Sequence, residues 1–224
     1  MLRAKGIAKF QFPKSDLNLN SKNLSNDFLI FPIIEPDHLW VFDKLIVAKK
    51  AGHICGPRGM DVPRPDFYMV RPVINFYGMG AGAEKVFIEK STKFIKNGYF
   101  WCEYFEGEHL SIDYRGVNPI LSVSGKKDVN DPYRKFTYWE KVEHSVPLPQ
   151  MLTKICLLYK TINCEFIGGK LIEIHLRANP DFSYGNTAMI PVWKGQNTTP
   201  PDGFKYLEDS PEGSDDERIG IWIR

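Results

Sequence analysis

The sequence predicts an α+β fold, because helix-like and strand-like segments occur in separate blocks along the chain. The segment 37–51 has apolar residues at helical spacing. The middle of the chain instead carries short aromatic and β-branched runs between glycine-containing turns, which is typical of antiparallel strands. The order is helix, several strands, helix, hairpin and tail, rather than the strand–helix alternation of a doubly wound parallel sheet.

Length and composition narrow the class of protein. The 224 residues suit one large domain or two small lobes and are enough to bury a core. The 29 basic and 27 acidic residues nearly cancel, so nucleic-acid binding is not indicated. The apolar runs are too short to span a membrane, and no signal peptide is recognisable. Four irregularly spaced cysteines indicate neither a disulfide framework nor a zinc site. We therefore expect a soluble cytoplasmic protein.

Two helices are expected, with an apolar segment before the first. In the helix over 37–51, Asp37 is a candidate N-terminal cap, and Gly52 follows the last turn. The apolar burst 28–34 before it predicts one short buried strand. Apolar residues recur at helical spacing again over 149–162, which predicts the second helix.

The strand signals are strongest in the middle and near the end of the chain. Strands are expected at 67–74, 99–105, 109–115, 119–124, 163–167, 170–176 and 218–223. The turns Glu106–Glu108 and Gly168–Gly169 each predict a hairpin between the flanking strands. Residues 194–217 are rich in glycine, proline and acidic residues and predict a mobile loop.

The hairpin around Gly168–Gly169 carries the most informative polar residues. Glu165 lies on its first strand. On the second strand, Glu173, His175 and Arg177 share one face, because side chains alternate along a strand. Such groups on an apolar strand need partners. They either form cross-strand ion pairs on a solvated sheet face, or they bind a divalent metal and an anion.

A second segment leads from a strand into a glycine-rich loop. Arg71 is the only cation in 67–74, and Gly78, Gly80 and Gly82 follow at every second position. The loop is either a flexible turn or a place where backbone N–H groups approach phosphate oxygens. The guanidinium of Arg71 needs an anionic partner, which is either a phosphate or a carboxylate of the protein.

A third segment, 101–113, is rich in aromatic and acidic residues. The turn Glu106–Glu108 is either a charged surface turn without a function or part of a binding site. Asp113 lies on the same strand face as Ser111 and His109. In this order, the three segments resemble those of the ATP-grasp superfamily, over about residues 37–182.

The resemblance implies an ATP-grasp-like fold of two small lobes with antiparallel sheets and flanking helices. Residues 1–36 would be an N-terminal extension or edge segment. Residues 37–98 would form the small lobe with its glycine-rich lid. Residues 99–224 would form the larger lobe with the metal-binding hairpin and a C-terminal loop.

The resemblance also implies roles for single residues. The implied metal ligands are Glu165, Glu173, His175 and Asn179. Arg71 would hold phosphate oxygens during catalysis, and Arg177 would stabilise the acyl phosphate. The implied nucleotide-binding residues, besides Arg71, are Gly78, Gly80 and Gly82 of the lid, the hinge Glu103, Tyr104 and Phe105, and Glu108.

The chain departs from the family pattern at two of these positions. Arg71 stands where the family has a lysine, and it can still bind phosphate. His175 stands where the family has a metal-binding asparagine, and histidine is a poorer magnesium ligand. On this resemblance, the 224 residues would hold little of the substrate-binding domain that usually precedes the two lobes. The chain thus resembles minimal ATP-grasp proteins of bacteriophages. On this resemblance, the protein could be encoded by a virus and act in the cytoplasm of the host.

The function implied by the resemblance is ATP- and Mg²⁺-dependent ligation. ATP would phosphorylate a small-molecule or peptide carboxylate, and an amine or thiol would then displace phosphate from the acyl phosphate. The alternative is an inactive module that binds a nucleotide or another protein. The sequence identifies neither the substrates nor the oligomeric state.

Overall fold

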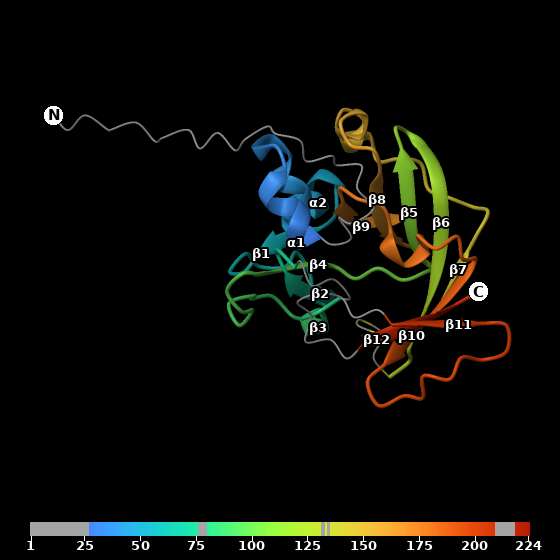
Figure 1. Ribbon diagram of the computed structural model, residues 1–224. Helices are drawn as coiled ribbons and strands as arrows, with labels where there is room; N and C mark the ends of the chain where they lie inside the picture. Colours follow the sequence, from blue (N-terminus) through green and yellow to red (C-terminus); the bar gives the residue numbers. More distant parts are fainter. Residues whose placement is uncertain (1–26, 76–79, 131–132, 134, 209–217) are drawn as a thin grey trace, which may run out of the picture.

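The computed structural model describes residues 27–75, 80–130, 133, 135–208 and 218–224. These residues form two antiparallel sheets and several short helices (Figure 1), which confirms the predicted α+β class. No helix in the described ranges is long and apolar enough to cross a membrane.

Four strands form the small sheet, in the order β1-β4-β2-β3. Their bounds are β1 (Cys55–Pro57), β2 (Asp66–Pro72), β3 (Glu84–Ile88) and β4 (Tyr99–Glu103). One face packs around Trp101, which is buried with Tyr68, Val70 and Ile88. The rings of Tyr68 and Trp101 meet edge to face at 5.1 Å, an arrangement that aromatic pairs prefer.

Eight strands form the large sheet, in the order β11-β12-β10-β7-β6-β5-β8-β9. Their bounds are β5 (His109–Arg115), β6 (Asn118–Lys127), β7 (Phe136–Lys141), β8 (Ile162–Ile167), β9 (Lys170–His175), β10 (Ala188–Trp193), β11 (Lys205–Glu208) and β12 (Arg218–Ile223). β9 is therefore the edge strand at one end of this sheet.

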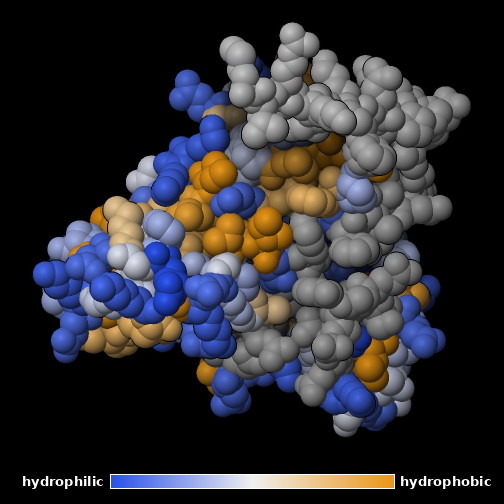
Figure 2. Space-filling view, turned by 90° about the vertical axis from the view of Figure 1, so that its left-hand side faces the viewer, coloured by the Kyte–Doolittle hydropathy of each residue, from blue (hydrophilic) through white to orange (hydrophobic). Residues whose placement is uncertain are grey.

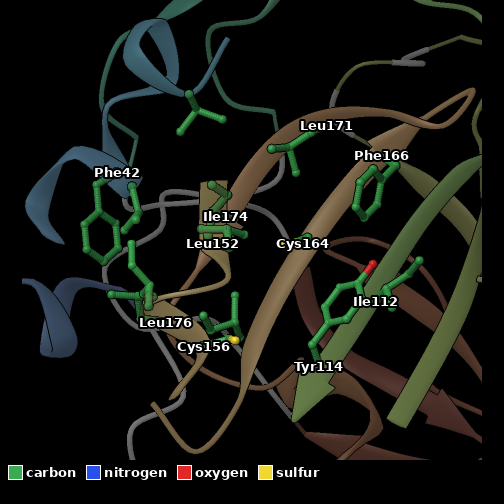
Figure 3. Packing of buried hydrophobic residues seen from close by; sticks show 14 of the residues in the cluster. Phe42, Ile112, Tyr114, Leu152, Cys156, Cys164, Phe166, Leu171, Ile174 and Leu176 are labelled. Carbon is green, nitrogen blue, oxygen red and sulfur yellow. The ribbon is translucent and has the colours of Figure 1, made fainter. Parts of the chain in front are cut away.

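The helical segments are short. They are α1 (Asp27–Ile30), η1 (Phe31–Ile33), η2 (Pro36–Phe42), α2 (Lys44–Lys50), η3 (Gln150–Leu152), η4 (Ile155–Leu157) and η5 (Pro180–Phe182). η2 and α2 pack against β9, so that Phe42 joins Leu152, Ile174 and Leu176 in one core (Figure 3). Burying each such side chain contributes about 1.5–3 kcal/mol, which fixes the helices on this end of the sheet.

The surface carries both hydrophobic and hydrophilic residues. Figure 2 shows hydrophobic residues gathered in the centre of one face, with hydrophilic residues mainly toward its edges. The small sheet exposes Phe67 and Phe87, whose rings lie 5.3 Å apart, and Lys85 Nζ lies 4.9 Å from the ring centre of Phe67.

The first predicted helix, over 37–51, is divided at Asp43. Residues 36–42 form the 3₁₀ segment η2, and Asp37 lies inside it rather than capping it. α2 begins at Lys44, because the Asp43 carboxylate accepts a hydrogen bond from the Ile46 N–H (2.8 Å). The strand predicted over 28–34 is wrong: α1 and η1 occupy it, since a short apolar run does not distinguish a strand from a helix.

The second predicted helix, over 149–162, is also wrong. The segment instead contains two separate 3₁₀ turns, η3 and η4, and Ile162 is already the first residue of β8. Leu152 and Ile155 are buried at the predicted spacing, whereas Leu158, predicted on the same side, is exposed. The apolar spacing thus reflects two local turns against the core rather than a continuous helix.

The hairpin predicted at Glu106–Glu108 does not form. β4 pairs with β1 and β2 in the small sheet, whereas β5 pairs with β6 and β8 in the large one. Residues 104–108 therefore carry the chain from one sheet to the other. The small sheet also includes β4, which lies beyond residue 98, the boundary expected for the small lobe.

The other turn and the last strand are where the sequence predicts them. β8 and β9 form a hairpin, and Gly168 and Gly169 have φ of +55° and +77°, the left-handed conformation that glycine favours. β12 pairs with β10 and β11. The predicted loop 194–217 contains β11, and its residues 209–217 lie outside the described residues.

Gly168 and Gly169 give a matched test of this turn. A Cβ on Gly168 would lie 2.3 Å from the carbonyl oxygen of Glu106, whereas one on Gly169 would meet nothing within 4 Å. We expect Gly169→Ala to lower the free energy of unfolding by about 1–2 kcal/mol, from the left-handed backbone alone. Gly168→Ala should cost about 1–3 kcal/mol more, because of the close contact. Urea unfolding measures both, and equal losses would contradict the contact with the crossover.

Candidate functional site

A cleft of about 260 Å³ lies between the two sheets. Its walls come from β2 and β4 on one side and from β5, β8 and β9 on the other, with Tyr104 and Phe105 of the crossover between them. The cleft brings together the predicted site residues Arg71, Gly80, Glu103, Tyr104, Phe105, Glu165, Glu173, His175, Arg177 and Asn179.

Two predicted residues that the structure describes, Gly82 and Glu108, are not among those that line the cleft. Gly78 lies outside the described residues. Gly82 is in the turn beside the cleft, with φ of +76°. Glu108 is exposed, and its carboxylate lies 2.7 Å from His144 Nε2. Hydrogen bonds from Ser124 and His144 lower the pKa of Glu108, so this carboxylate has partners in the protein.

Glu165 and Glu173 are directly opposite each other in the pairing of β8 with β9. Each carboxylate has a cationic or hydrogen-bonding partner in the protein. Lys44 at the start of α2 forms an ion pair with Glu173, and His109 Nε2 lies 3.1 Å from Glu165 Oε2. Burial raises the pKa of Glu165, but His109 and His175 together lower it well below its ordinary value. Glu165 is therefore ionised at neutral pH.

His175 lies among three carboxylates. Its Nδ1 hydrogen-bonds to Asp27, and its Nε2 is 3.7 Å from Oε1 of both Glu165 and Glu173. Burial lowers the pKa of His175, but Asp27 and Glu165 outweigh this effect and raise the pKa to about 9. The imidazole is therefore charged at neutral pH, with an N–H on both ring nitrogens.

Asp27 is a residue of this site that the sequence did not reveal. It is 4% exposed, and its Oδ1 accepts a hydrogen bond from Arg177 Nε (3.0 Å). Burial raises its pKa, but His175 and Arg177 lower it to about 2. No motif surrounds Asp27, which is 150 positions from Arg177 in the sequence, so only the folded chain brings them together.

Asn179 is held by the protein through both ends of its amide. Its Nδ2 donates to Ser111 Oγ (3.2 Å), and its Oδ1 accepts from the Asp181 N–H (3.0 Å). The Asn179 N–H donates to Asp113 (2.9 Å), which also accepts from Asn163. Burial raises the pKa of Asp113. This network fixes the chain after β9 against β5.

Arg71 and Lys127 are the two cations of the cleft without an ion-pair partner in the part of the chain that the structure describes. Arg71 Nη2 donates to the carbonyl oxygen of Ile172 (3.1 Å), and its buried Nε has no hydrogen-bond partner among those residues. Burial lowers the pKa of Lys127, whereas Glu165 opposes this change. Lys127 carries no sequence motif, so reasoning from the sequence missed it.

A magnesium ion does not fit the four expected ligands as they are arranged. Magnesium requires oxygen ligands at about 2.0–2.1 Å in octahedral geometry. Glu173 is already paired with Lys44, and the Asn179 oxygen already accepts a hydrogen bond from the Asp181 N–H. Among the described residues, no three His, Cys, Asp or Glu side chains are grouped to hold a metal ion.

Solved ATP-grasp structures are similar to this chain. One is a protein from Archaeoglobus fulgidus assigned to the ATP-grasp superfamily, with 11% sequence identity and a TM-score of 0.47 over 88% of this chain and 73% of that protein. No family model and no curated protein matches the sequence.

Two ligases are also similar. L-amino acid ligase from Bacillus licheniformis has 10% identity and a TM-score of 0.40, over 66% of this chain and 43% of the ligase. D-alanine–D-alanine ligase from Bacillus anthracis has 13% identity and a TM-score of 0.38, over 65% of this chain and 59% of the ligase. This chain therefore spans about half the length of these ligases.

Proposed function

We propose that the cleft binds ATP and that the protein is an ATP-dependent ligase, which joins a carboxylate to an amine or a thiol through an acyl phosphate. The observation that supports this most directly is the pair Arg71 and Lys127, two cations that line the cleft and form no salt bridge with a carboxylate of the described residues. A half-buried guanidinium needs an anionic partner, and phosphate oxygens accept bidentate hydrogen bonds from arginine.

The crossover supports binding of the adenine base. Glu103, Tyr104 and Phe105 line the cleft where β4 ends, and Met69 and Ile172 add apolar surface. A flat purine fits between such apolar walls, and backbone groups of the crossover would recognise its polar edge. Lys85 Nζ lies 3.8 Å from the centre of the Tyr104 ring, which holds this ring in place.

The glycine-containing turn and the cations support binding of the phosphates. Gly80 and Ala81 line the cleft, and a Cβ on Gly82 would come within 2.6 Å of Tyr99 Oη. A turn of this kind brings the backbone close to a ligand. Phosphoryl transfer requires alignment of the reacting groups and neutralisation of charge. Arg71 would neutralise the phosphates, and Arg177 would stabilise the acyl phosphate.

Nucleotide binding without catalysis is the second candidate. The observation that favours it is the pairing of Glu173 with Lys44 and of Asp27 with Arg177, because groups held in ion pairs are less available to reactants. The carboxylate substrate, the nucleophile and a cytoplasmic location stay predictions.

The test combines thermal unfolding with product analysis. ATP at 100 times its Kd should stabilise the protein by about 2.7 kcal/mol, which raises Tm by roughly 5–10 °C. A flat response to millimolar ATP, with and without magnesium, would refute ATP binding. ADP release that depends on an added carboxylic acid, with the acyl phosphate trapped by hydroxylamine, would identify a ligase. Binding without ADP release across amino acids and peptides would favour the second candidate.

A further inference from the structure

We infer that the carboxylic acid substrate carries an aromatic ring, and that this ring binds against Phe136 and Trp139 on the β7 side of the cleft. The inference rests on the proposed function, because it assigns a substrate class to the same cleft. Both side chains line the cleft, and both residues are only partly buried. These two rings are called the aromatic platform below.

The aromatic platform is built over a glycine. Gly125 lies within β6, where it pairs with His109 of β5 and with Trp139 of β7. A Cβ on Gly125 would lie 2.8 Å from both the Phe136 ring and the Trp139 ring. The backbone of Gly125 is not in the left-handed region, so its conformation does not require glycine. The close approach of the two rings does require it, because any larger residue would displace them.

Neighbouring rings hold the platform in one arrangement. The ring centres of Phe136 and Trp139 lie 4.4 Å apart, with their planes inclined by 35°. The His109 ring meets both of them edge to face, at 5.0 Å and 5.5 Å. A surface that is already ordered loses little conformational entropy when a ligand binds. An aromatic ring of a ligand therefore finds partners for the offset and edge-to-face contacts that such rings prefer.

The platform lies away from the place proposed for adenine. β7 and β9 are on opposite sides of β5 (Figure 1), and β6, β5 and β8 lie between them. Four strand spacings correspond to about 19 Å across the sheet. Ile172 of the proposed adenine site is on β9, whereas Phe136 and Trp139 are on β7. The base therefore does not reach the platform, which leaves this side of the cleft to the second reactant.

A cation beside the platform indicates that this reactant is an acid. Lys127 is directly opposite Phe136 in the pairing of β6 with β7, and both line the cleft. Opposed side chains have Cβ atoms about 4.5–5.5 Å apart, so a short alkyl chain would join a carboxylate at Lys127 to a ring on Phe136. The ammonium has several N–H donors and can contact a phosphate oxygen as well. A carboxylate oxygen held there can bond to the terminal phosphorus of ATP as the bond from that phosphorus to ADP breaks.

The first experiment uses the unmodified protein. ADP is titrated calorimetrically with millimolar MgCl₂, and the ADP-saturated protein is then titrated with 3-phenylpropionate, 3-cyclohexylpropionate and propionate. We expect 3-phenylpropionate to bind at least about tenfold more tightly than propionate, because its ring is buried. It should bind about 2- to 10-fold more tightly than the cyclohexyl acid, because only an aromatic ring gains the ring–ring contacts.

The outcomes separate this inference from the proposed function. If ADP binds but 3-phenylpropionate binds no better than propionate or 3-cyclohexylpropionate, or no acid binds at millimolar concentration, the inference is overturned and nucleotide binding stands. If ADP does not bind, the proposed function is refuted, and the inference fails with it.

Gly125→Ala tests where the ring binds. The added methyl group would push the platform rings into the cleft, so 3-phenylpropionate should bind at least about tenfold more weakly, while the Kd of ADP changes by less than about threefold. Gly56→Ala is the matched control: a Cβ on this β1 residue would also lie 2.8 Å from a tryptophan ring, that of Trp101, and neither residue lines the cleft. The control should change neither affinity. A folded Gly125→Ala protein that keeps its affinity for the acid, or loses affinity for ADP alone, would overturn the inference.

Phe136→Leu decides the question if Gly125→Ala does not fold. Leucine keeps an apolar side chain in the cleft but removes one ring of the platform, so 3-phenylpropionate should bind about 2- to 10-fold more weakly and ADP equally well. Phe87→Leu is the control, because Phe87 is exposed on the small sheet and does not line the cleft. Unchanged affinity of Phe136→Leu for 3-phenylpropionate would overturn the inference.

Discussion

Arg71→Met is expected to weaken ATP binding by about 10- to 100-fold, because hydrogen bonds to a charged group contribute about 1.5–3 kcal/mol. The free protein should lose only about 1 kcal/mol of stability, since Arg71 gives up one hydrogen bond to the Ile172 carbonyl and no ion pair among the described residues. Methionine keeps an apolar chain of similar length against the Phe100 ring, which lies 5.3 Å from the guanidinium. Nucleotide titrations and thermal melts of the free protein measure the two effects separately.

Two further substitutions sharpen this result. Arg71→Lys should be intermediate, because lysine keeps the charge and loses the bidentate geometry. Lys126→Met is the control: Lys126 neighbours Lys127 in β6, but it is exposed and pairs with Glu140. If Arg71→Met instead destabilises the free protein by several kcal/mol, and affinity falls only as far as unfolding requires, Arg71 is a structural residue.

Asp27→Ala is expected to lower the free energy of unfolding by about 3–5 kcal/mol, the range for breaking one side of a buried ion pair. The substitution leaves the buried His175 and the Arg177 guanidinium without their shared carboxylate. Urea unfolding followed by tryptophan fluorescence measures the loss. Asp61→Ala is the control: Asp61 is exposed, so its loss should stay within about 0.5 kcal/mol.

The pH dependence of the stability difference between the unmodified protein and Asp27→Ala is a second measure of the contact between Asp27 and His175. Since the pKa of His175 is raised from 6.5 to about 9, the stability that this shift contributes is fully present below pH 6.5 and is lost as pH rises through about 9. The gap between the unmodified protein and Asp27→Ala should therefore narrow above neutral pH. A gap that is small at every pH would show that α1 does not anchor the site.

Local features of the fold could be predicted, whereas partner choice between strands could not. The β8–β9 hairpin was predictable because two glycines in sequence specify a tight turn between two strands. The sequence from β4 to β5 also has two strand-like segments around a short glycine-containing turn, yet the two strands belong to different sheets. Nothing within 99–115 encodes that difference, because it depends on which distant strands are available to pair.

The candidate site divides in the same way. Arg71, Glu165 and Glu173 were found from alternation and turn spacing, which are short-range properties of a strand. Only tertiary packing brings Asp27 to Arg177 and Lys127 to the cleft, so no local pattern marks either residue. His175 was expected to bind a metal, and the carboxylate of Asp27, which contacts its Nδ1, comes from a distant part of the chain that no local pattern connects with it.

The contacts between the two sheets also bear on self-association. β9 is an edge strand, and open edges invite pairing with a strand of another molecule. Two consecutive carbonyl groups of β9 accept hydrogen bonds from side chains of other segments: Leu171 from His53 Nε2 (2.8 Å) and Ile172 from Arg71 Nη2 (3.1 Å). Because these two carbonyl groups already accept hydrogen bonds within the chain, they are less available to a strand of another molecule. The residues that form the cleft wall on this side therefore also reduce intermolecular β-pairing, the step that begins aggregation.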